Sequence, residues 1–157
     1  MVTVPPVIHL ALVVAKFNSQ ITNKMLQRAL TYSRKLGATV TYVCKVPGSY
    51  DMPLTMKTLL EKDNVDAVVA LGAIVRGGTK HDEVIAYALT NKMSDLCVQY
   101  GKPVSLGVVG PGATWKQAQD RINEYAERSV TSAVNMVLLQ RKLKRSTQKS
   151  KRPVVVE

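Results

Sequence analysis

The residues best suited to hold an anionic group lie in a glycine-rich segment at residues 71–83, which reads LGAIVRGGTKHDE. Glycine lets backbone amides approach an oxyanion, and the start of a helix adds unpaired amides and the positive end of a dipole. A phosphate would therefore fit at Gly77, Gly78 and Thr79. The spacing of Thr79 and Asp82 is equally typical of a capping box, a device that merely begins a helix. Spacing alone leaves both interpretations open.

His81 stands beside this proposed anion site, in the first turn of a predicted helix. An imidazole can gain or lose a proton near neutral pH, which suits it to general acid–base catalysis. A single histidine is nevertheless more often structural or simply exposed. The residues alone make His81 a candidate for proton transfer and no more.

Two further candidates follow predicted strands. Phe17 is the only phenylalanine in the chain, and its ring could either stack on a heterocycle or fold back to cover the core. Asp51 lies between Pro47-Gly48 and Pro53. Its carboxylate could accept hydrogen bonds from a polyhydroxyl substrate, or it could cap the helix that begins there.

Arg121 and Arg128 are two helical turns apart on the last predicted helix. Their guanidinium groups could bind a phosphate, because a planar guanidinium matches the geometry of phosphate oxygens. Arginines on an amphipathic helix are more often only solvated, so this pair carries little weight alone.

Alternating strand and helix patterns must position these residues. Unbroken aliphatic and β-branched runs predict buried strands at residues 8–15, 39–44, 65–71 and 104–109, each ending near glycine or proline. Helical spacing of apolar residues predicts helices at 21–36, 52–62, 84–100 and 114–143, the last with Trp115 on its inner side. This order predicts an α/β/α sandwich of three layers, flavodoxin-like, around a parallel sheet of four strands. Ligands in such sheets bind beyond the carboxyl ends of the strands, where all the candidates above except the two arginines lie.

Composition predicts one domain at residues 1–145 and a basic, disordered tail at 146–157. The net charge is +11, and seven basic residues follow residue 140, where Glu157 is the only acid. Without that segment, the chain's 22 basic and 11 acidic residues fall to 15 and 10. The charge block lacks interleaved aromatics, so we expect nucleic-acid binding to be at most a salt-sensitive side activity.

The sequence also bears on membrane insertion, secretion and metal binding. No run approaches the ~18 apolar residues of a membrane span, and the first residues lack the features of a signal peptide, so a cytoplasmic protein is expected. Cys44 and Cys97 lie in apolar segments without metal-ligand spacing, so we expect two buried thiols and no metal site.

Five segments, in order and in register, resemble the lumazine synthase family over about residues 8–140. They are VAKFN at 14–18, VPGSYDMP at 46–53, LGAIVRGGTKH at 71–81, Pro103-Val104 with Gly107-Val108, and QAQDR at 117–121. The resemblance implies a riboflavin-biosynthesis transferase that uses neither metal nor organic cofactor. It would condense 5-amino-6-(D-ribitylamino)uracil with 3,4-dihydroxy-2-butanone 4-phosphate, giving 6,7-dimethyl-8-ribityllumazine, phosphate and water.

The resemblance also implies site roles. Phe17, with Asn18, would stack on the pyrimidine, and His81 would move protons. The ribityl chain would lie on Ser49, Tyr50 and Asp51, the ring pocket on Ala73, Ile74 and Val75, and the phosphate on Gly77, Gly78 and Thr79. In this family a neighbouring subunit supplies the residues at Leu106 and Arg121, which implies a homo-oligomer: a pentamer, alone or gathered into a sixty-subunit shell.

The sequence departs from the family pattern at several positions. The family usually has phenylalanine at Leu106, an aromatic residue at Asp82 and a leucine-threonine step where this chain has Val109-Gly110-Pro111-Gly112. Arg128 stands near a position where a second phosphate-binding lysine is common. These changes resemble the archaeal branch, which includes a riboflavin synthase paralogue. That paralogue and a non-catalytic polyanion-binding module are the alternatives to lumazine synthase.

Overall fold

A parallel sheet of four strands forms the centre of the protein. The structure is a computed structural model that describes residues 6–147 and 151–157. The strands are β1 (His9–Ala15), β2 (Thr39–Val46), β3 (Ala67–Val75) and β4 (Val104–Ala113). They lie in the order β2-β1-β3-β4, and every neighbouring pair is parallel. The expected four-stranded parallel sheet is confirmed.

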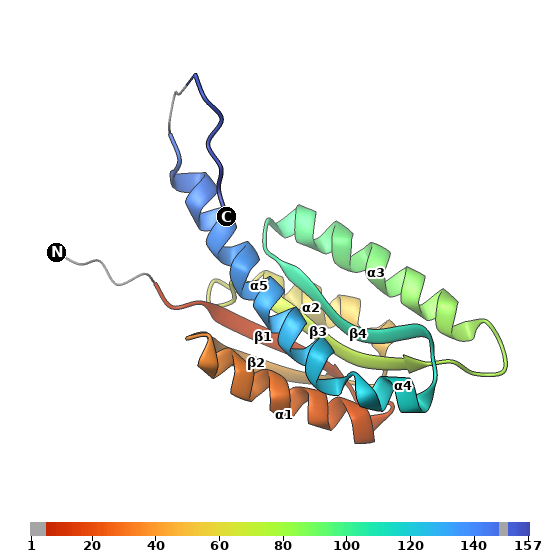
Figure 1. Ribbon diagram of the computed structural model, residues 1–157. Coiled ribbons are helices and arrows are strands. Elements are labelled where there is room, and N and C mark those ends of the chain that lie inside the picture. Colours follow the sequence, from red (N-terminus) through yellow and green to blue (C-terminus); the bar gives the residue numbers. More distant parts are fainter. Residues whose placement is uncertain (1–5, 148–150) are drawn as a thin grey trace.

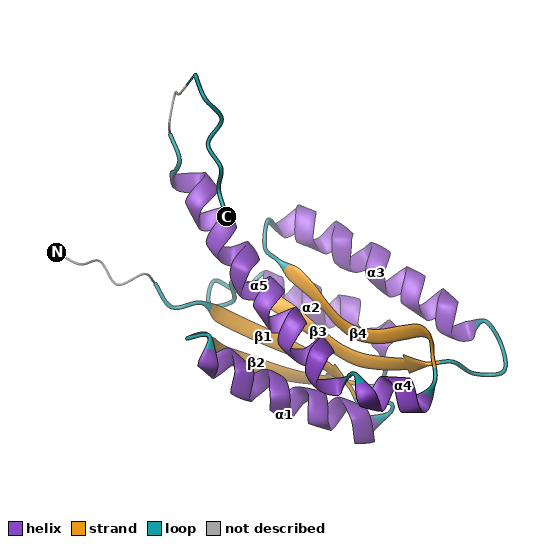
Figure 2. Ribbon diagram, in the orientation of Figure 1, coloured by secondary structure: helices purple, strands orange, loops and turns teal. Residues whose placement is uncertain are grey.

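Helices cover both faces of this sheet, as Figures 1 and 2 show. Helix α1 (Ser19–Lys35), the short α4 (Trp115–Asp120) and α5 (Ile122–Arg145) pack on one face. Helices α2 (Met52–Leu60) and α3 (His81–Tyr100) pack on the other, with a 3-10 turn, η1 (Ser49–Asp51), before α2. The expected three-layer sandwich is therefore confirmed.

Alternation along the inner strands divides the core into two layers. Leu10 and Leu12 of β1 point into the layer with α1 and α5, whereas Ala11 and Val13 point into the layer with α2 and α3. All four side chains are fully buried. A strand covered on both faces reads as a continuous apolar run because neither set of side chains meets water.

Three strands run further than their sequence pattern predicted, β2 by only two residues, to Val46. Strand β3 continues past Gly72 to Val75, and β4 continues through Gly110, Pro111 and Gly112 to Ala113. Gly72 does not end the strand. A Cβ there would lie 2.7 Å from the Ser49 Oγ, so this glycine permits a close approach of η1 to the sheet.

The last predicted helix was wrong in one respect, because it is two helices rather than one. The break is at Arg121, which has φ −104° and ψ 6°. The sequence from Trp115 to Arg145 contains no glycine or proline, so no local signal marked the break. Helix α4 packs against the end of β4, and this tertiary contact sets its direction. Trp115, expected to face inward, is 37% exposed at the first position of α4.

Three smaller expectations concern the periphery. Cys44 and Cys97 are free but only half-buried, so their prediction as buried thiols was wrong: each lies in an outer element with one open side. None of the described helices combines the length and apolar character needed to cross a bilayer. The predicted tail falls partly on residues 148–150, which lie outside the described residues. The described residues 151–157 form no helix or strand, and Lys142 donates a hydrogen bond to the Glu157 backbone oxygen.

Candidate active site

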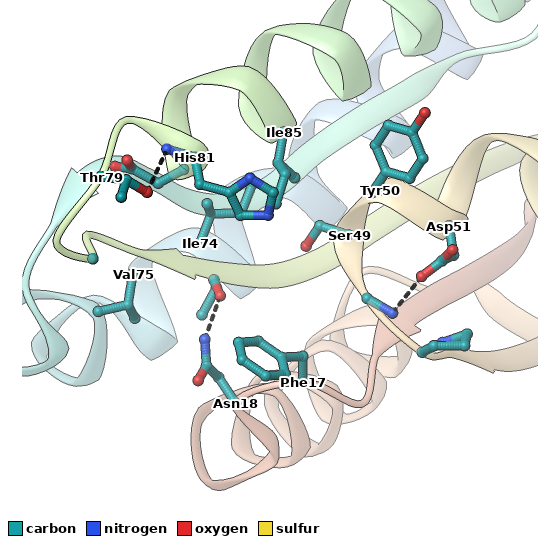
Figure 3. Close-up of a pocket in the computed structure, with 15 residues that line it drawn as sticks. Phe17, Asn18, Ser49, Tyr50, Asp51, Ile74, Val75, Thr79, His81 and Ile85 are labelled. Carbon is teal, nitrogen blue, oxygen red and sulfur yellow. Dashed lines mark hydrogen bonds between the residues drawn. The ribbon is translucent and has the colours of Figure 1, made fainter.

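A cavity of about 490 Å³ opens at the carboxyl ends of β1 and β3, the two strands at which the chain's direction of winding changes. Open α/β sheets bind ligands at this switch point, and the volume suits a small molecule. Figure 3 shows side chains converging on it from four separate segments. The predicted site residues that line it are Phe17, Asn18, Ser49, Tyr50, Asp51, Ala73, Ile74, Val75, Gly77, Thr79 and His81.

The turn after β1 presents Phe17 to the cavity. Asn18 adopts the left-handed conformation (φ 58°), and its Nδ2 donates a 2.7 Å hydrogen bond to the Ala73 backbone oxygen. The Phe17 backbone N–H donates a 3.0 Å bond to the Pro47 oxygen. These bonds tie the turn to both neighbouring strands, and the Phe17 ring is 72% exposed. The alternative in which the ring covers the core is therefore wrong, because the turn directs it outward.

The turn after β2 brings three polar side chains to the cavity. Ser49 is buried and its hydroxyl faces the pocket, whereas Tyr50 and Asp51 are exposed at the rim (Figure 3). The Asp51 carboxylate accepts a 2.9 Å hydrogen bond from the Gly48 backbone N–H. The Asp51 side chain forms no capping hydrogen bond with the start of α2, so the helix-capping alternative for Asp51 is wrong. Its carboxylate instead closes the 3-10 turn that precedes α2.

Strand β3 and the first turns of α3 form the apolar wall. Ala73 and Ile74 are nearly buried, and Ile85 stands one helical turn after His81 on the same side of α3. An apolar wall facing polar groups on η1 is the arrangement expected for a ligand with a flat ring and a hydroxylated chain.

The loop from Gly77 to Lys80 leads into α3, and His81 is the first residue of that helix. Figure 3 shows its imidazole pointing into the cavity on the side of Ser49. The His81 backbone N–H lies 3.4 Å from the Thr79 hydroxyl, and the capping residue Lys80 makes no side-chain cap bond. The Asp82 carboxylate bonds elsewhere, to the Gly112 N–H at 2.9 Å. The predicted capping box of Thr79 and Asp82 is therefore not formed, and the start of α3 keeps unpaired N–H groups beside the cavity.

The remaining predicted site residues lie outside this cavity. Gly78 is exposed on the loop. Arg121 lines a separate hollow of about 210 Å³ beside Gly110 and Gly112. Arg128 pairs with Glu124 at 3.5 Å, and its guanidinium lies 4.7 Å from the centre of the Tyr125 ring. Leu106, 47% exposed, lies in a third hollow between β4 and α3.

The cavity has an unusual charge balance. Of the residues that line it in the described part of the chain, Asp51 and Asp82 are acidic and none is lysine or arginine. Arg76 and Lys80 are exposed on the adjoining loop but do not line the cavity. A phosphate bound here would meet backbone N–H groups and the dipole of α3, but no guanidinium from the same chain.

Sequence analysis missed four lining residues: Pro47, Gly48, Asp82 and Ile85. The first two belong to the segment already assigned to the site, and the spacing of His81 and Ile85 could have identified the latter. Asp82 was interpreted only as a helix cap and as a departure from a family pattern. Within the described residues, no cluster of three or more His, Cys, Asp or Glu side chains could hold a metal ion.

Comparison with known proteins gives one consistent result. The model of the family described as 6,7-dimethyl-8-ribityllumazine synthase matches residues 7–141. A 6,7-dimethyl-8-ribityllumazine synthase from Sulfolobus acidocaldarius is 52% identical over 137 residues, 87% of each chain. Proteins of the same description from Saccharolobus solfataricus (53% over 136 residues, 87% of this chain and 88% of the relative) and Pyrobaculum calidifontis (51% over 137 residues, 87% and 91%) are similar. These three organisms are archaea, the branch that the sequence resembles.

Proposed function

Because the chain belongs to the 6,7-dimethyl-8-ribityllumazine synthase family, and is therefore an enzyme of the transferase class, we propose that the cavity around His81 is its active site. There 5-amino-6-(D-ribitylamino)uracil condenses with 3,4-dihydroxy-2-butanone 4-phosphate to 6,7-dimethyl-8-ribityllumazine, phosphate and water. One observation carries the proposal: a single cavity gathers the exposed Phe17 ring, the polar η1 turn and the His81 imidazole from distant segments.

Each part of the cavity suits one part of the substrates. The exposed face of Phe17 stacks on the pyrimidine, and Ser49 and the backbone around Asp51 hold the ribityl hydroxyls. The phosphate lies on the amides from Gly77 to Thr79, at the positive end of α3. This places His81 between the ring and the phosphate, where imine formation, loss of phosphate, ring closure and dehydration each require a proton to move.

The missing guanidinium supports a site shared between subunits. A phosphate in a cavity lined by two carboxylates and no cation needs positive charge from elsewhere. We propose that a neighbouring copy supplies Arg121, with Leu106 completing the ring pocket and Arg128 near the phosphate. The protein then works as a cyclic pentamer, either alone or within a sixty-subunit shell.

The surface of the single chain is consistent with such an assembly. Strand β4 is an edge of the sheet and carries the exposed Leu106. Helix α3 beside it exposes Val84, Tyr87 and Val98, at 63%, 60% and 82%. An open edge strand flanked by exposed apolar side chains is a surface that proteins normally cover.

The test mixes the purified protein with both substrates and follows the fluorescence of the lumazine product. We expect turnover above the uncatalysed rate, and we expect His81→Ala to lose about 10²–10⁴-fold of it, the usual size of an acid–base contribution. Turnover no faster than background would refute the proposal. A second reaction with dimethylribityllumazine alone is expected to give no riboflavin; its appearance would identify the riboflavin synthase alternative instead.

A further inference from the structure

The carboxylate of Asp82 is buried in the wall that separates the His81 cavity from the hollow of Arg121. Only 7% of this residue is exposed, although it carries an acidic group. Its Oδ2 accepts a 2.9 Å hydrogen bond from the Gly112 backbone N–H. Among the described residues, no lysine or arginine forms an ion pair with it. A buried acid without a cation requires a specific reason, since its burial is otherwise unfavourable.

The partner of Asp82 is a backbone group that the sheet leaves unpaired. Ala73 pairs with Val109 and Val75 pairs with Ala113, so Ile74 alone faces the three residues Gly110, Pro111 and Gly112. This bulge takes the Gly112 N–H out of the ladder of β3 and β4. Gly112 has φ +79°, a conformation that glycine adopts without strain. Asp82 therefore satisfies a donor that the bulge would otherwise orphan.

One contact thus joins two features that are far apart in the sequence. The Gly110-Pro111-Gly112 bulge takes a backbone amide of β4 out of the ladder, and the carboxylate of Asp82 accepts its hydrogen bond. Each group supplies the partner that the burial of the other requires.

Few other side-chain hydrogen bonds fix the first turn of α3. The Lys80 cap makes no side-chain bond, and the Thr79 hydroxyl lies at the long distance of 3.4 Å from the His81 N–H. The loop before it, from Arg76 to Lys80, is exposed throughout. The bond from Asp82 to Gly112 is the only hydrogen bond from a side chain of this turn to another element that the described residues show.

We propose that Asp82 is a positioning residue: its hydrogen bond to Gly112 holds the first turn of α3, and with it the His81 imidazole, over the cavity. This inference rests on the proposed function, because it needs a reaction in which His81 acts. It also links the two halves of the shared site. The bulge at Gly110-Pro111-Gly112 also borders the hollow of Arg121. The bond from Asp82 to Gly112 therefore connects the turn that carries His81 to the segment beside Arg121, the residue proposed to serve the neighbouring subunit.

The experiment measures kcat/KM for lumazine formation in Asp82→Ala, in wild-type and in His81→Ala backgrounds. Removing the acceptor in the wild-type background should cost about tenfold or more, since a displacement near 1 Å can cost that much. In the His81→Ala background the same change should cost less than about twofold, because the group it positions is gone. An equal loss in both backgrounds would mean a general structural role and would overturn the proposal.

Two further variants separate the hydrogen bond from the charge and from folding. Asp82→Asn keeps an acceptor oxygen and should retain most of the activity; a loss as large as that of Asp82→Ala would overturn the hydrogen-bond assignment. Glu83→Ala removes an acid from the same turn and should behave as wild type, because Glu83 forms no hydrogen bond or ion pair among the described residues. If Asp82→Ala does not fold, Asp82→Ser, whose side chain is shorter than that of aspartate, replaces it in the same comparison. An inactive wild-type protein would refute the proposed function, whereas an active one insensitive to Asp82→Ala would refute only this inference.

Discussion

At the scale of single residues, Phe17 shows most directly how exposure indicates function. The Phe17 ring is 72% exposed beside the cavity, so it contributes little to the stability of the isolated chain. Its contribution is instead expected in the binding of a ligand. Stacking on a flat heterocycle is worth about 0.5–1.5 kcal/mol beyond the area that it buries. The proposed stacking on the substrate ring gives the outward direction of this ring a function.

Phe17→Ala is therefore expected to raise the KM for ribitylaminouracil by about threefold to tenfold, the equivalent of one stacking contact. The KM for butanone phosphate should change little, because that substrate has no ring. Steady-state kinetics with each substrate varied in turn measures both. Leu54→Ala provides the matched control, since Leu54 is equally exposed at 75% but does not line the cavity. A rise in both KM values, or the same rise in the control, would exclude stacking at Phe17.

Sequence could identify most of these residues, but not how they are held. His81 and Thr79 were candidates because their residue types suit proton transfer and anion binding, and both line the cavity. Asp82 was not a candidate, because its partner Gly112 is 30 positions away and is reached only after β4 forms its bulge. A contact between segments this distant has no local pattern to reveal it.

At the scale of elements, the turn between β1 and α1 depends on one asparagine. Asn18 is the only residue other than glycine with a positive φ among the described residues, and asparagine tolerates that conformation better than most residues. Its side chain also joins the turn to Ala73 at the end of β3. The conformation and the hydrogen bond together hold Phe17 at the cavity.

Two substitutions separate what the hydrogen bond and the left-handed conformation of Asn18 each contribute to the stability of the fold. Asn18→Gly removes the hydrogen bond but keeps the left-handed conformation accessible, and we expect a loss of about 1 kcal/mol in the free energy of unfolding. Asn18→Ala removes the bond and adds a left-handed alanine, for a further loss of about 1–2 kcal/mol. Urea denaturation at equal protein concentration measures both. If alanine proved as stable as glycine, the position would not be held in the left-handed region.

Element type was predictable from the sequence, whereas element ends were not. Apolar and β-branched runs identified all four strands, and they are continuous in β1 and β3 because both faces of the sheet are covered there. Gly72 and Gly110 were interpreted as the ends of strands. A Cβ added at Gly72 would lie 2.7 Å from the Ser49 Oγ, and one added at Gly110 would lie 2.2 Å from the Ile74 backbone oxygen. Glycine indicates close backbone approach as well as a turn, and only the tertiary structure distinguishes the two.

At the scale of the whole molecule, the cavity of one chain has no lysine or arginine among the described residues that line it. Arg121 lies at the end of the α4 helix and lines a hollow of its own, separated from the cavity by the β4 bulge. No sequence pattern states whether such a residue serves its own chain or a neighbour, because both arrangements place it at the same position along the helix. The resemblance supplied that expectation, and the cation-free cavity supports it.

Mixing inactive variants tests the sharing of the site between subunits. His81→Ala and Arg121→Ala, unfolded together and refolded into mixed oligomers, should recover activity, because some sites combine an intact His81 with an intact Arg121 from the neighbour. Random mixing in equal amounts makes about a quarter of the sites complete in a cyclic assembly. His81→Ala mixed with Phe17→Ala is the control. Both residues line the cavity of the same chain, so every mixed site carries one defect and the mixture should show no more than the average activity of the two separate variants. If the first mixture stayed inactive while light scattering showed assembled oligomers, Arg121 would act within its own chain and the shared site would have to be abandoned.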